Sequence, residues 1–433
     1  ELSEKAKTAV QYALLHLTER EAAFEHKQVM ETALKHVLGE VSAEFIQKEI
    51  LAAEKKGTLI KGIASENGTN WTTLEAIKME REIIAFALQD QGKLAPIADS
   101  EKAQAHLASV EMKAEHKAAI DMVLTYQDRF AIVQGHAGTG KTTMLMQLET
   151  MLKAEGFNMV CLAPTHVAVK EIRARGLTAE TLDSYLASKQ NETAAALENS
   201  KDSKAGLPQQ SASKTLVIID EASMVSNARL HAYEAMVIKQ NQRGLIIGDK
   251  NQYHAIESGK PLSLLMQAGV KTSYLTEIIR QKDETLKEVV AAIYDKDHAK
   301  AFRLLDKNII EIGHELDSQG EIKINGRQRR HEAIRDKYLS LTPQERASKL
   351  IIAFGNKERV ELNKVIQEGL IAKGELKGRS LTTEILASKD MTNVEKASAA
   401  NYEVGECLRF NLANKAAGIE KGEYLTRVLS KPY

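Results

Sequence analysis

The sequence predicts an α/β fold with a parallel sheet, preceded by an all-helical region and followed by a small β module. Continuous apolar runs alternate with helical stretches between residues 106 and 271. This is the pattern expected of parallel strands that helices cover on both faces. Residues 1–105 show helical periodicity, and short strand-like pieces separated by turns begin after about residue 380.

Composition places the chain among ordinary globular proteins. Its 433 residues correspond to about two to four domains. Lysine and arginine together number 59, as do aspartate and glutamate, so no overall basic charge favours nucleic-acid binding. Cys161 and Cys407 lack metal-ligand spacing and favour a reducing, cytoplasmic location. No apolar stretch approaches the roughly 20 residues of a membrane span, so no membrane insertion is expected.

Residues 1–105 are predicted to form a helical N-terminal domain. Helical spacing of apolar residues is shown by Val10, Ala13, Leu14 and Leu17. Another helical stretch covers 74–83, and turns are expected at glycine-containing segments such as 67–70. Trp71, the only tryptophan, is predicted to anchor the core, with a base-stacking role as the alternative. The chain begins at Glu1 without a methionine, which suggests a piece of a longer protein.

Residues 106–271 are predicted to form the first α/β unit. The apolar runs that predict its buried parallel strands are 130–134, 159–163, 215–219 and 244–248. The segment 187–214 interrupts this pattern because it is polar and nearly featureless. We expect it to be a surface excursion from the core, either a mobile loop or a small protruding element.

A second α/β unit is expected over residues 272–379. It would begin with a strand at 273–275, continue through helices to about residue 305, and include another strand at 349–354. Residues 380–433 are expected to start a small β module within which the chain stops.

The most specific motif is the run Gly135-His136-Ala137-Gly138-Thr139-Gly140-Lys141-Thr142, which fits the phosphate-loop pattern G-x-x-x-x-G-K-[ST]. An apolar strand precedes it, and a helix that includes Thr143 follows. Glycines let backbone N–H groups converge on phosphate oxygens, and the helix dipole adds positive potential. Lys141 would then contact the β- and γ-phosphates, and the Thr142 hydroxyl would ligate Mg²⁺. The alternative is a chance glycine-rich turn before a helix.

Two acids follow the apolar strand 215–219. Asp220 would belong to the Mg²⁺ shell, and Glu221 would polarise the attacking water. An Asp-Glu pair at a strand end can also be a solvated turn. Its position after a phosphate loop, in the same predicted sheet, favours the catalytic interpretation.

Two further polar side chains follow predicted strands. Gln252 comes after the strand 244–248 and could bond the γ-phosphate or the attacking water, although an ordinary Gly-Asp turn is the alternative. Arg280 follows the strand expected to open the second α/β unit. Its guanidinium could reach across a domain border and neutralise transition-state charge, whereas a surface arginine is the alternative.

The order of these motifs resembles that of superfamily 1 helicases. Finer details are similar to the RecD-like, 5′-to-3′ branch, and within it to the helicase part of conjugative relaxases of the TraI/TrwC family. The segments that carry this second resemblance are 13–20, 71–76, 128–135, 164–169 and 221–225. The resemblance extends over nearly the whole chain.

This resemblance implies RecA-like P-loop motor domains: domain 1A at 106–271, the first part of domain 2A at 272–379, and a truncated 2B-like insertion at 380–433. It implies an ATP-dependent DNA helicase that uses ATP and Mg²⁺ and translocates on single-stranded DNA during plasmid transfer. Type IV secretion and relaxosome proteins are the implied protein partners. The residues implied to contact single-stranded DNA are Pro164, Thr165, His166 and Thr181.

The sequence departs from the family pattern in two ways. His116 stands where relatives carry an adenine-reading glutamine, and it cannot make the paired amide contact. The closing motifs, a His-x-x-Gln-Gly segment and a Thr-Arg segment, are not found before Tyr433. A catalytically incomplete fragment that binds single-stranded DNA or a secretion partner is therefore the alternative function. The 187–214 excursion could be the pin that separates DNA strands.

Overall fold

The computed structural model divides into two compact units, residues 1–287 with 389–433, and residues 288–388. The described residues are 1–65, 68–189, 213–377, 381, 383–411, 413–414 and 417–426. Most of the expected excursion at 187–214, and with it the expected strand-separating pin, therefore lies outside the described residues.

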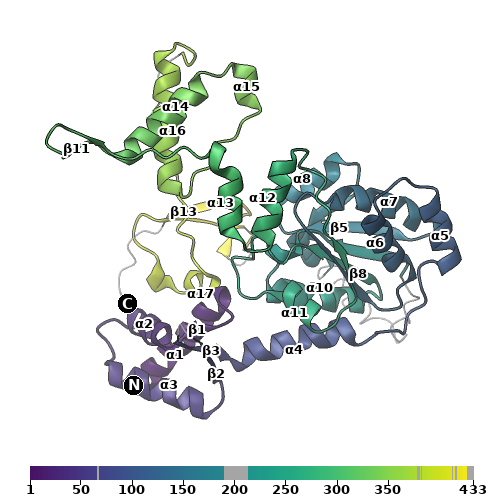
Figure 1. Ribbon diagram of the computed structural model, residues 1–433. Coiled ribbons are helices and arrows are strands. Elements are labelled where there is room, and N and C mark those ends of the chain that lie inside the picture. Colours follow the sequence, from purple (N-terminus) through teal and green to yellow (C-terminus); the bar gives the residue numbers. More distant parts are fainter. Residues whose placement is uncertain are drawn as a thin grey trace. The chain divides into compact units, whose positions relative to one another are not determined.

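A six-stranded parallel sheet forms the centre of the first unit (Figure 1). Its strands, in the order in which they pair, are β6 (Ala179–Thr181), β5 (Asn158–Ala163), β7 (Thr215–Ile219), β8 (Arg243–Gly248), β4 (Phe130–Gly135) and β9 (Thr272–Leu275). The predicted α/β fold class is confirmed, and so are the four strands predicted from continuous apolar runs. The short β6 was not predicted as a strand.

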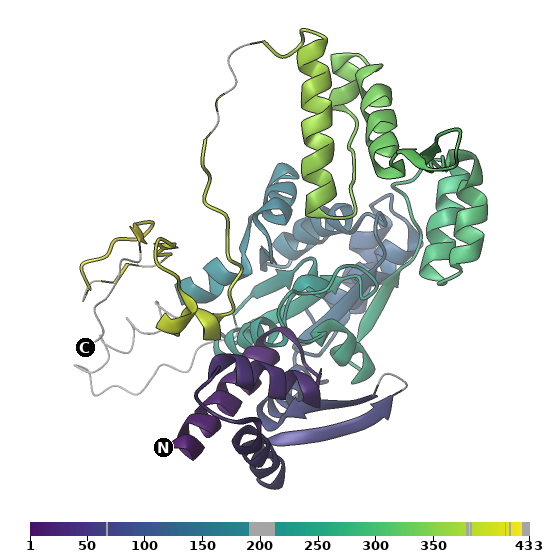
Figure 2. The same ribbon diagram turned by 90° about the vertical axis from the view of Figure 1, so that its left-hand side faces the viewer.

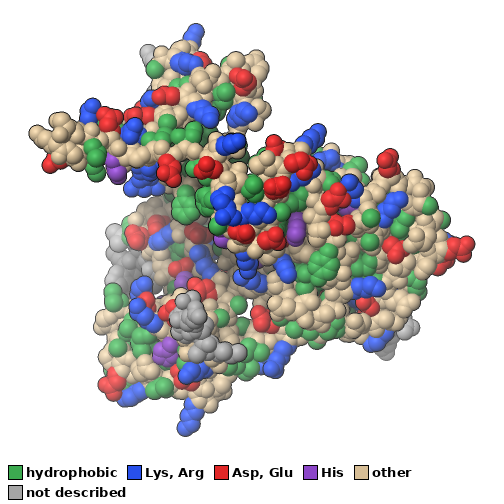
Figure 3. Space-filling view, viewed as in Figure 1, with side chains coloured by type: hydrophobic (Ala, Val, Ile, Leu, Met, Phe, Trp, Pro, Cys, Tyr) green, Lys and Arg blue, Asp and Glu red, His purple; other side chains and the backbone are tan. Residues whose placement is uncertain are grey.

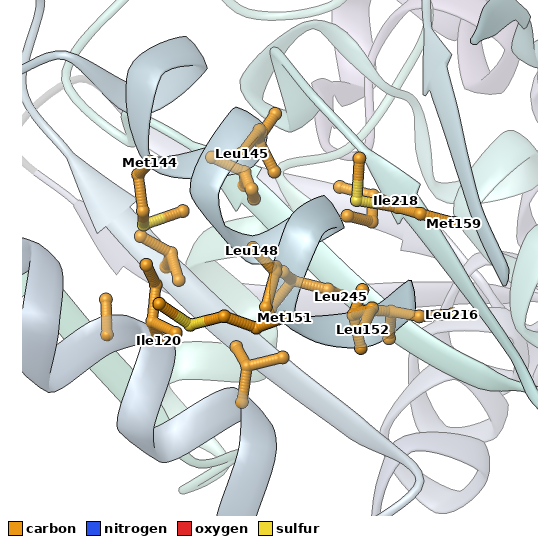
Figure 4. Close-up of a cluster of buried hydrophobic side chains, with 14 of the residues drawn as sticks. Ile120, Met144, Leu145, Leu148, Met151, Leu152, Met159, Leu216, Ile218 and Leu245 are labelled. Atoms are coloured by element: carbon orange, nitrogen blue, oxygen red, sulfur yellow. The ribbon is translucent and has the colours of Figure 1, made fainter. Parts of the chain in front are cut away.

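Helices cover both faces of this sheet, which explains why the strands are apolar on both sides. One face packs against α5 (Ser100–Ala108), α6 (Ala114–Thr125), α7 (Lys141–Ala154) and α8 (His166–Ala174). The other face packs against α4 (Leu74–Leu88), α10 (Asn227–Lys239) and α11 (Pro261–Gln267), and against helical residues 182–189. In Figure 4, α7 directs its apolar side chains, among them Leu148 and Leu152, into the cluster that contains Leu216 and Leu245 of the sheet.

The N-terminal region is not all-helical, so that prediction is wrong. Helices α1 (Leu2–Arg20), α2 (His26–His36) and α3 (Ala43–Lys55) pack with an antiparallel sheet of β1 (Phe24–Glu25), β2 (Leu59–Ser65) and β3 (Gly68–Thr73). Figure 2 shows the β2–β3 hairpin as a pair of long arrows. Threonines and a tryptophan in β3 favour an extended strand over a turn. Trp71 is half-buried against the apolar cluster of this region.

The strand predicted at 273–275 exists as β9, but it belongs to the first sheet. It pairs in parallel with β4, with Gln134 opposite Tyr274 and Gly135 opposite Leu275. The expectation that this strand opens a second α/β unit is therefore wrong. A short apolar run cannot reveal which sheet it joins, because only its pairing partners decide that.

The second unit consists mainly of helices. Its elements are the later part of α12 (Glu284–Tyr294), α13 (His298–Leu305), η2 (Asp306–Asn308), β10 (Glu315–Leu316), β11 (Ile322–Ile324), α14 (Gly326–Leu339), α15 (Pro343–Ala347) and α16 (Asn356–Ala372). Helices α14 and α16 lie side by side in Figures 1 and 2.

The strand predicted at 349–354 is absent. Leu350, Ile352 and Phe354 are each more than four-fifths exposed, and these residues pair with no described strand. A parallel strand is stabilised by neighbours on both edges and by cover on both faces. The described residues of this unit supply neither.

The last part of the first unit contains short elements, as predicted for a small β module. They are α17 (Asn393–Lys396), η3 (Ala399–Asn401) and the antiparallel pair β12 (Cys407–Arg409) and β13 (Tyr424–Thr426). The Glu19 carboxylate of α1 accepts hydrogen bonds from the Asn393 backbone N–H at 2.8 and 2.9 Å, which attaches α17 to the N-terminal region.

Positive and negative side chains are interspersed on the face seen in Figure 3, in keeping with the equal numbers of acidic and basic residues. Among the described residues, no helix combines the length and the apolar character that crossing a membrane requires.

Glu234 on α10 generates a stability prediction. Its side chain is fully buried, and neither carboxylate oxygen has a hydrogen-bond partner among the described residues. Burial raises its pKa to about 9. Between pH 4.5 and about 9 the folded state therefore holds a proton on Glu234 that the unfolded state has released. The free energy of unfolding falls as the pH rises through this range.

We expect Glu234→Gln to raise the free energy of unfolding at pH 8 by about 1–3 kcal/mol, and to change it much less at pH 5. Urea unfolding at both pH values measures this difference. The exposed Glu288→Gln serves as the matched control. An equal effect of Glu234→Gln at both pH values would show that Glu234 is ionised in the folded protein.

Candidate nucleotide-binding site

A cavity of about 350 Å³ lies where β4, β7 and β8 end. Its lining residues are Ala137, Gly138, Thr139, Gly140, Lys141, Thr142, Thr143, Ala168, Glu171, Ile172, Arg175, Asp220, Glu221, Gln252, Ile279 and Arg280. The structure thus brings most of the predicted phosphate-loop residues together with both predicted acids, the predicted glutamine and the predicted arginine. The carboxyl edge of a parallel sheet is the usual place for a ligand in such folds.

Two glycines of the phosphate loop have backbone conformations that other residues avoid. Gly138 and Gly140 have φ angles of 79° and 83°. A Cβ atom at Gly138 would lie 2.8 Å from Cβ of Arg280, and one at Gly140 would lie 2.7 Å from Cδ1 of Ile279. Glycine is therefore required here by the φ angle and by the close approach of the segment after β9.

The loop leads directly into α7, whose N-cap is Gly140. The first N–H groups of a helix have no partner within the helix, and they favour an anion at that end. Lys141 is 9% exposed, and its ammonium donates a hydrogen bond to the Gly135 carbonyl oxygen at 2.9 Å. This bond holds a positive charge inside the loop.

Two predicted loop residues, Gly135 and His136, do not line the cavity themselves. The His136 backbone N–H donates to the Leu275 carbonyl oxygen at 3.0 Å, and its own carbonyl oxygen accepts from the Thr139 hydroxyl at 2.9 Å. Both residues act on the shape of the loop through their backbones.

Asp220 and Glu221 lie together in the cavity lining. Asp220 is almost completely buried, and its Oδ1 accepts a hydrogen bond from the Glu221 N–H at 2.9 Å. Burial, with the charge of Glu221 as the next contribution, raises the pKa of Asp220 to about 6, against the lowering effect of Lys141. A buried carboxylate whose negative charge is only partly balanced by Lys141 favours a further cation nearby.

Glu221 has a φ of 54° and a ψ of 41°, in the left-handed region that side chains other than glycine seldom adopt. This conformation costs about 1–3 kcal/mol and occurs most often at functional sites. It marks the turn from β7 into η1 (Ala222–Met224).

Gln252 is held by a residue that the sequence interpretation missed. Asp249 is fully buried, and its carboxylate accepts hydrogen bonds from the Gln252 side-chain amide at 3.1 Å and the Gln134 side-chain amide at 3.0 Å. The Gln134 side-chain oxygen Oε1 in turn accepts a hydrogen bond from the Lys250 backbone N–H at 3.0 Å. A glutamine inside the otherwise apolar run of β4 was the available signal for this network.

Arg280 lines the cavity from the segment that follows β9. The backbone N–H groups of Ile279 and Arg280 donate to the Gly138 carbonyl oxygen at 2.9 and 3.0 Å. Since β9 pairs with β4 and Arg280 lies within the same compact unit, this arginine does not reach the cavity from across a domain border. Two further charged residues of the lining were not predicted, namely Glu171 of α8 and Arg175, the C-cap of that helix.

His116 is buried in the first turn of α6 and does not line the cavity. Its Nε2 lies 2.6 Å from the Thr139 carbonyl oxygen, so the ring contacts the phosphate loop without lining the cavity. A contact between His116 and a nucleotide base stays a prediction.

The four residues predicted to contact DNA lie outside the cavity, at the ends of the adjacent strands β5 and β6. The Thr165 hydroxyl accepts from the Ala168 N–H at 3.2 Å and caps α8, and the Thr181 hydroxyl accepts from the Ser184 N–H at 3.3 Å. His166 is exposed and Pro164 is half-buried. They lie at the same carboxyl edge of the sheet as the cavity.

A glycine comparison tests the close approach at the loop. Gly138→Ala and Gly176→Ala both place a side chain on a left-handed backbone, but a Cβ at Gly176 would meet no atom within 4 Å. We expect Gly138→Ala to lower the free energy of unfolding by about 1–3 kcal/mol more than Gly176→Ala, because the segment containing Arg280 must shift. Urea unfolding measures the difference, and equal losses would refute the contact.

Comparison with known proteins supports the motif interpretation. A family model described as an AAA domain matches residues 111–314. The chain is 27% identical to the multifunctional conjugation protein TraI of Escherichia coli (strain K12) over 463 aligned positions, covering 97% of this chain and 25% of that protein. It therefore spans about a quarter of the length of this relative.

Two other relatives match smaller parts of the chain. The conjugal transfer protein TraA of Agrobacterium fabrum is 25% identical, over 47% of this chain and 17% of that protein. The ATP-dependent RecD2 DNA helicase of Deinococcus radiodurans is 29% identical, over 42% of this chain and 24% of that protein. In sequence, the chain is thus similar to conjugation proteins and to a RecD2 DNA helicase, and part of it matches an AAA-domain model.

Proposed function

We propose that this chain is the ATP-dependent, single-stranded DNA translocase and helicase segment of a conjugative relaxase, which unwinds plasmid DNA for transfer. The observation that carries the proposal is the single cavity lined by the phosphate loop, Asp220, Glu221, Gln252 and Arg280. A nucleotide-binding protein without hydrolysis would need the loop, but it would not need a paired acid and an arginine converging on the same space.

The residues present fit ATP and Mg²⁺. The loop has no room for side chains at Gly138 and Gly140, and it holds the Lys141 ammonium inside. Asp220 and Thr142 would hold the Mg²⁺ ion, since carboxylates and hydroxyls are the oxygen ligands that it prefers. A bound Mg²⁺ ion neutralises charge that develops on the phosphate oxygens.

The remaining lining residues have separate roles in hydrolysis. Glu221 accepts a proton from the attacking water, which requires its carboxylate to be ionised. Gln252, oriented by Asp249, bonds that water or the γ-phosphate and so distinguishes the two nucleotide states. Arg280 stabilises negative charge in the transition state.

Single-stranded DNA would cross the carboxyl edge of the sheet at Thr165, His166 and Thr181. Thr165 and Thr181 are caps of the helical segments that follow β5 and β6, so a shift of either segment would move the DNA-contacting surface. This arrangement would couple the nucleotide cavity to the bound DNA strand, since Glu171 of α8 and Arg175, the residue that ends α8, also line the cavity. Binding to type IV secretion and relaxosome proteins stays a prediction from the resemblance.

A second function is favoured by one observation in the second unit. The strand expected at 349–354 is not formed, and residues 288–377 contribute no parallel strand. In related motors the second domain supplies a further arginine to the nucleotide site, and such an arginine can raise the hydrolysis rate by about 10³–10⁵. Without it, the chain would bind nucleotide and DNA but turn ATP over inefficiently. In that case the chain would act as a binding module.

The leading function predicts that ATP hydrolysis by the intact protein increases when single-stranded DNA is added. We expect Lys141→Ala to lower this stimulated rate by about 100-fold or more, because a charge next to the transferred phosphate is lost. Lys153→Ala, which changes an exposed lysine on the same helix, is the matched control. An ATPase rate that ignores DNA would refute translocation, and unfolding of Lys141→Ala by circular dichroism would argue against a purely chemical role.

Single-turnover hydrolysis separates the motor from the binding module. We expect the 433-residue chain with bound ATP to hydrolyse it at a rate close to that of a longer form containing the closing motifs. A rate lower by about 10³-fold or more would instead favour the binding module.

A further inference from the structure

Two consecutive residues in the first turn of α6 hold two different parts of the nucleotide site. Glu115 contacts the segment between β9 and Arg280, and His116 contacts the phosphate loop. Neither residue lines the cavity, so neither is placed to touch the phosphates or the reacting water.

The Glu115 carboxylate accepts hydrogen bonds from the backbone that follows β9. Its Oε2 accepts hydrogen bonds from the Thr276 N–H at 2.6 Å and the Glu277 N–H at 3.0 Å, and its Oε1 accepts from the Thr276 hydroxyl. Lys113 forms an ion pair with Glu277 at 2.7 Å beside these contacts. The carboxylate therefore satisfies the first two N–H groups after the strand.

The segment from Thr276 to Arg280 is thus attached at both ends. Glu115 holds its start, and two N–H groups at its end donate to the Gly138 carbonyl oxygen. Ile279 and Arg280 also lie against the loop so closely that the loop glycines have no room for side chains. A five-residue segment with both ends bonded has little freedom, which fixes where the Arg280 side chain begins.

Charge strengthens the Glu115 contacts. Burial acts to raise the pKa of Glu115, but the hydrogen bonds from Glu277 and Thr276 outweigh it and lower the pKa. The carboxylate is therefore ionised at neutral pH, and hydrogen bonds to an ionised acceptor are about twice as strong as neutral ones.

We propose that Glu115 is a positioning residue for Arg280: through the 276–277 backbone it holds the arginine at the phosphate loop during hydrolysis. This role rests on the proposed ATPase function. Removal of the Glu115 carboxylate should slow the chemical step more than it weakens nucleotide binding, because Lys141 and the loop glycines are unchanged. Glu115 and Arg280 should also act as one unit, since the first works only through the second.

The test compares Glu115→Ala, Glu115→Gln, Arg280→Ala and the double variant Glu115→Ala/Arg280→Ala. We expect Glu115→Ala to lower kcat by about 10- to 100-fold, with the Kd for ATP within about threefold of the original value. Glu115→Gln keeps an acceptor oxygen without the charge and should recover part of the rate. Glu111→Ala, an exposed acid just before α6, is the matched control and should leave kcat unchanged.

The double variant distinguishes positioning from general loss of structure. A rate no lower than that of Arg280→Ala supports the proposal, because removing Glu115 has no further effect once the arginine is gone. Multiplied losses, or a rise in the Kd for ATP as large as the fall in kcat, would overturn it.

Amide hydrogen exchange separates this proposal from the proposed function. If the unchanged protein hydrolyses no ATP, the proposed function fails, and the anchoring role is judged by exchange alone. Faster exchange of residues 276–281 in Glu115→Ala, with residues 158–163 unchanged, supports anchoring by Glu115. Unchanged exchange at 276–281 refutes it whether or not ATP is hydrolysed.

Discussion

The parallel pairing of β4 with β8 and β9 is the constraint on which the nucleotide site depends. Gln134 pairs with Gly248, and Gly135 pairs with Leu275, so three chain segments leave the sheet at the same level. Those segments become the phosphate loop, the turn containing Asp249 and Gln252, and the segment carrying Arg280. A shift of one residue in either register would separate the loop from the side chains that meet it.

Backbone contacts perform much of the assembly at this edge. The Gly138 carbonyl oxygen accepts hydrogen bonds from the backbone N–H groups of Ile279 and Arg280. The His136 N–H donates to the Leu275 carbonyl oxygen. Two carboxylates complete the connections: the buried Asp249 joins Gln134 to Gln252, and the half-buried Glu115 joins α6 to the end of β9. The functional side chains are thus supported by residues such as Gln134, Asp249 and Glu115, which do not line the cavity.

The sequence predicted the parts of the protein whose signals are local. Four apolar runs became strands of one sheet, and the motif spacings predicted residues that share one cavity. It failed where the outcome depends on distant partners. The run at 349–354 has strand character but no described neighbours, β9 joined the first sheet, and the 59–73 region formed a hairpin within a region expected to be helical.

The sequence by itself determined the chemistry available to this protein, because glycine, lysine and acid spacings around a phosphate loop leave few other interpretations. Only the tertiary structure decided which residues support that chemistry. Asp249, Gln134 and Glu115 act through partners more than 100 positions away in the chain, and no short pattern reveals such pairs. The physical reason is that sheet register and helix packing, which create these contacts, are set by the whole core rather than by neighbouring residues.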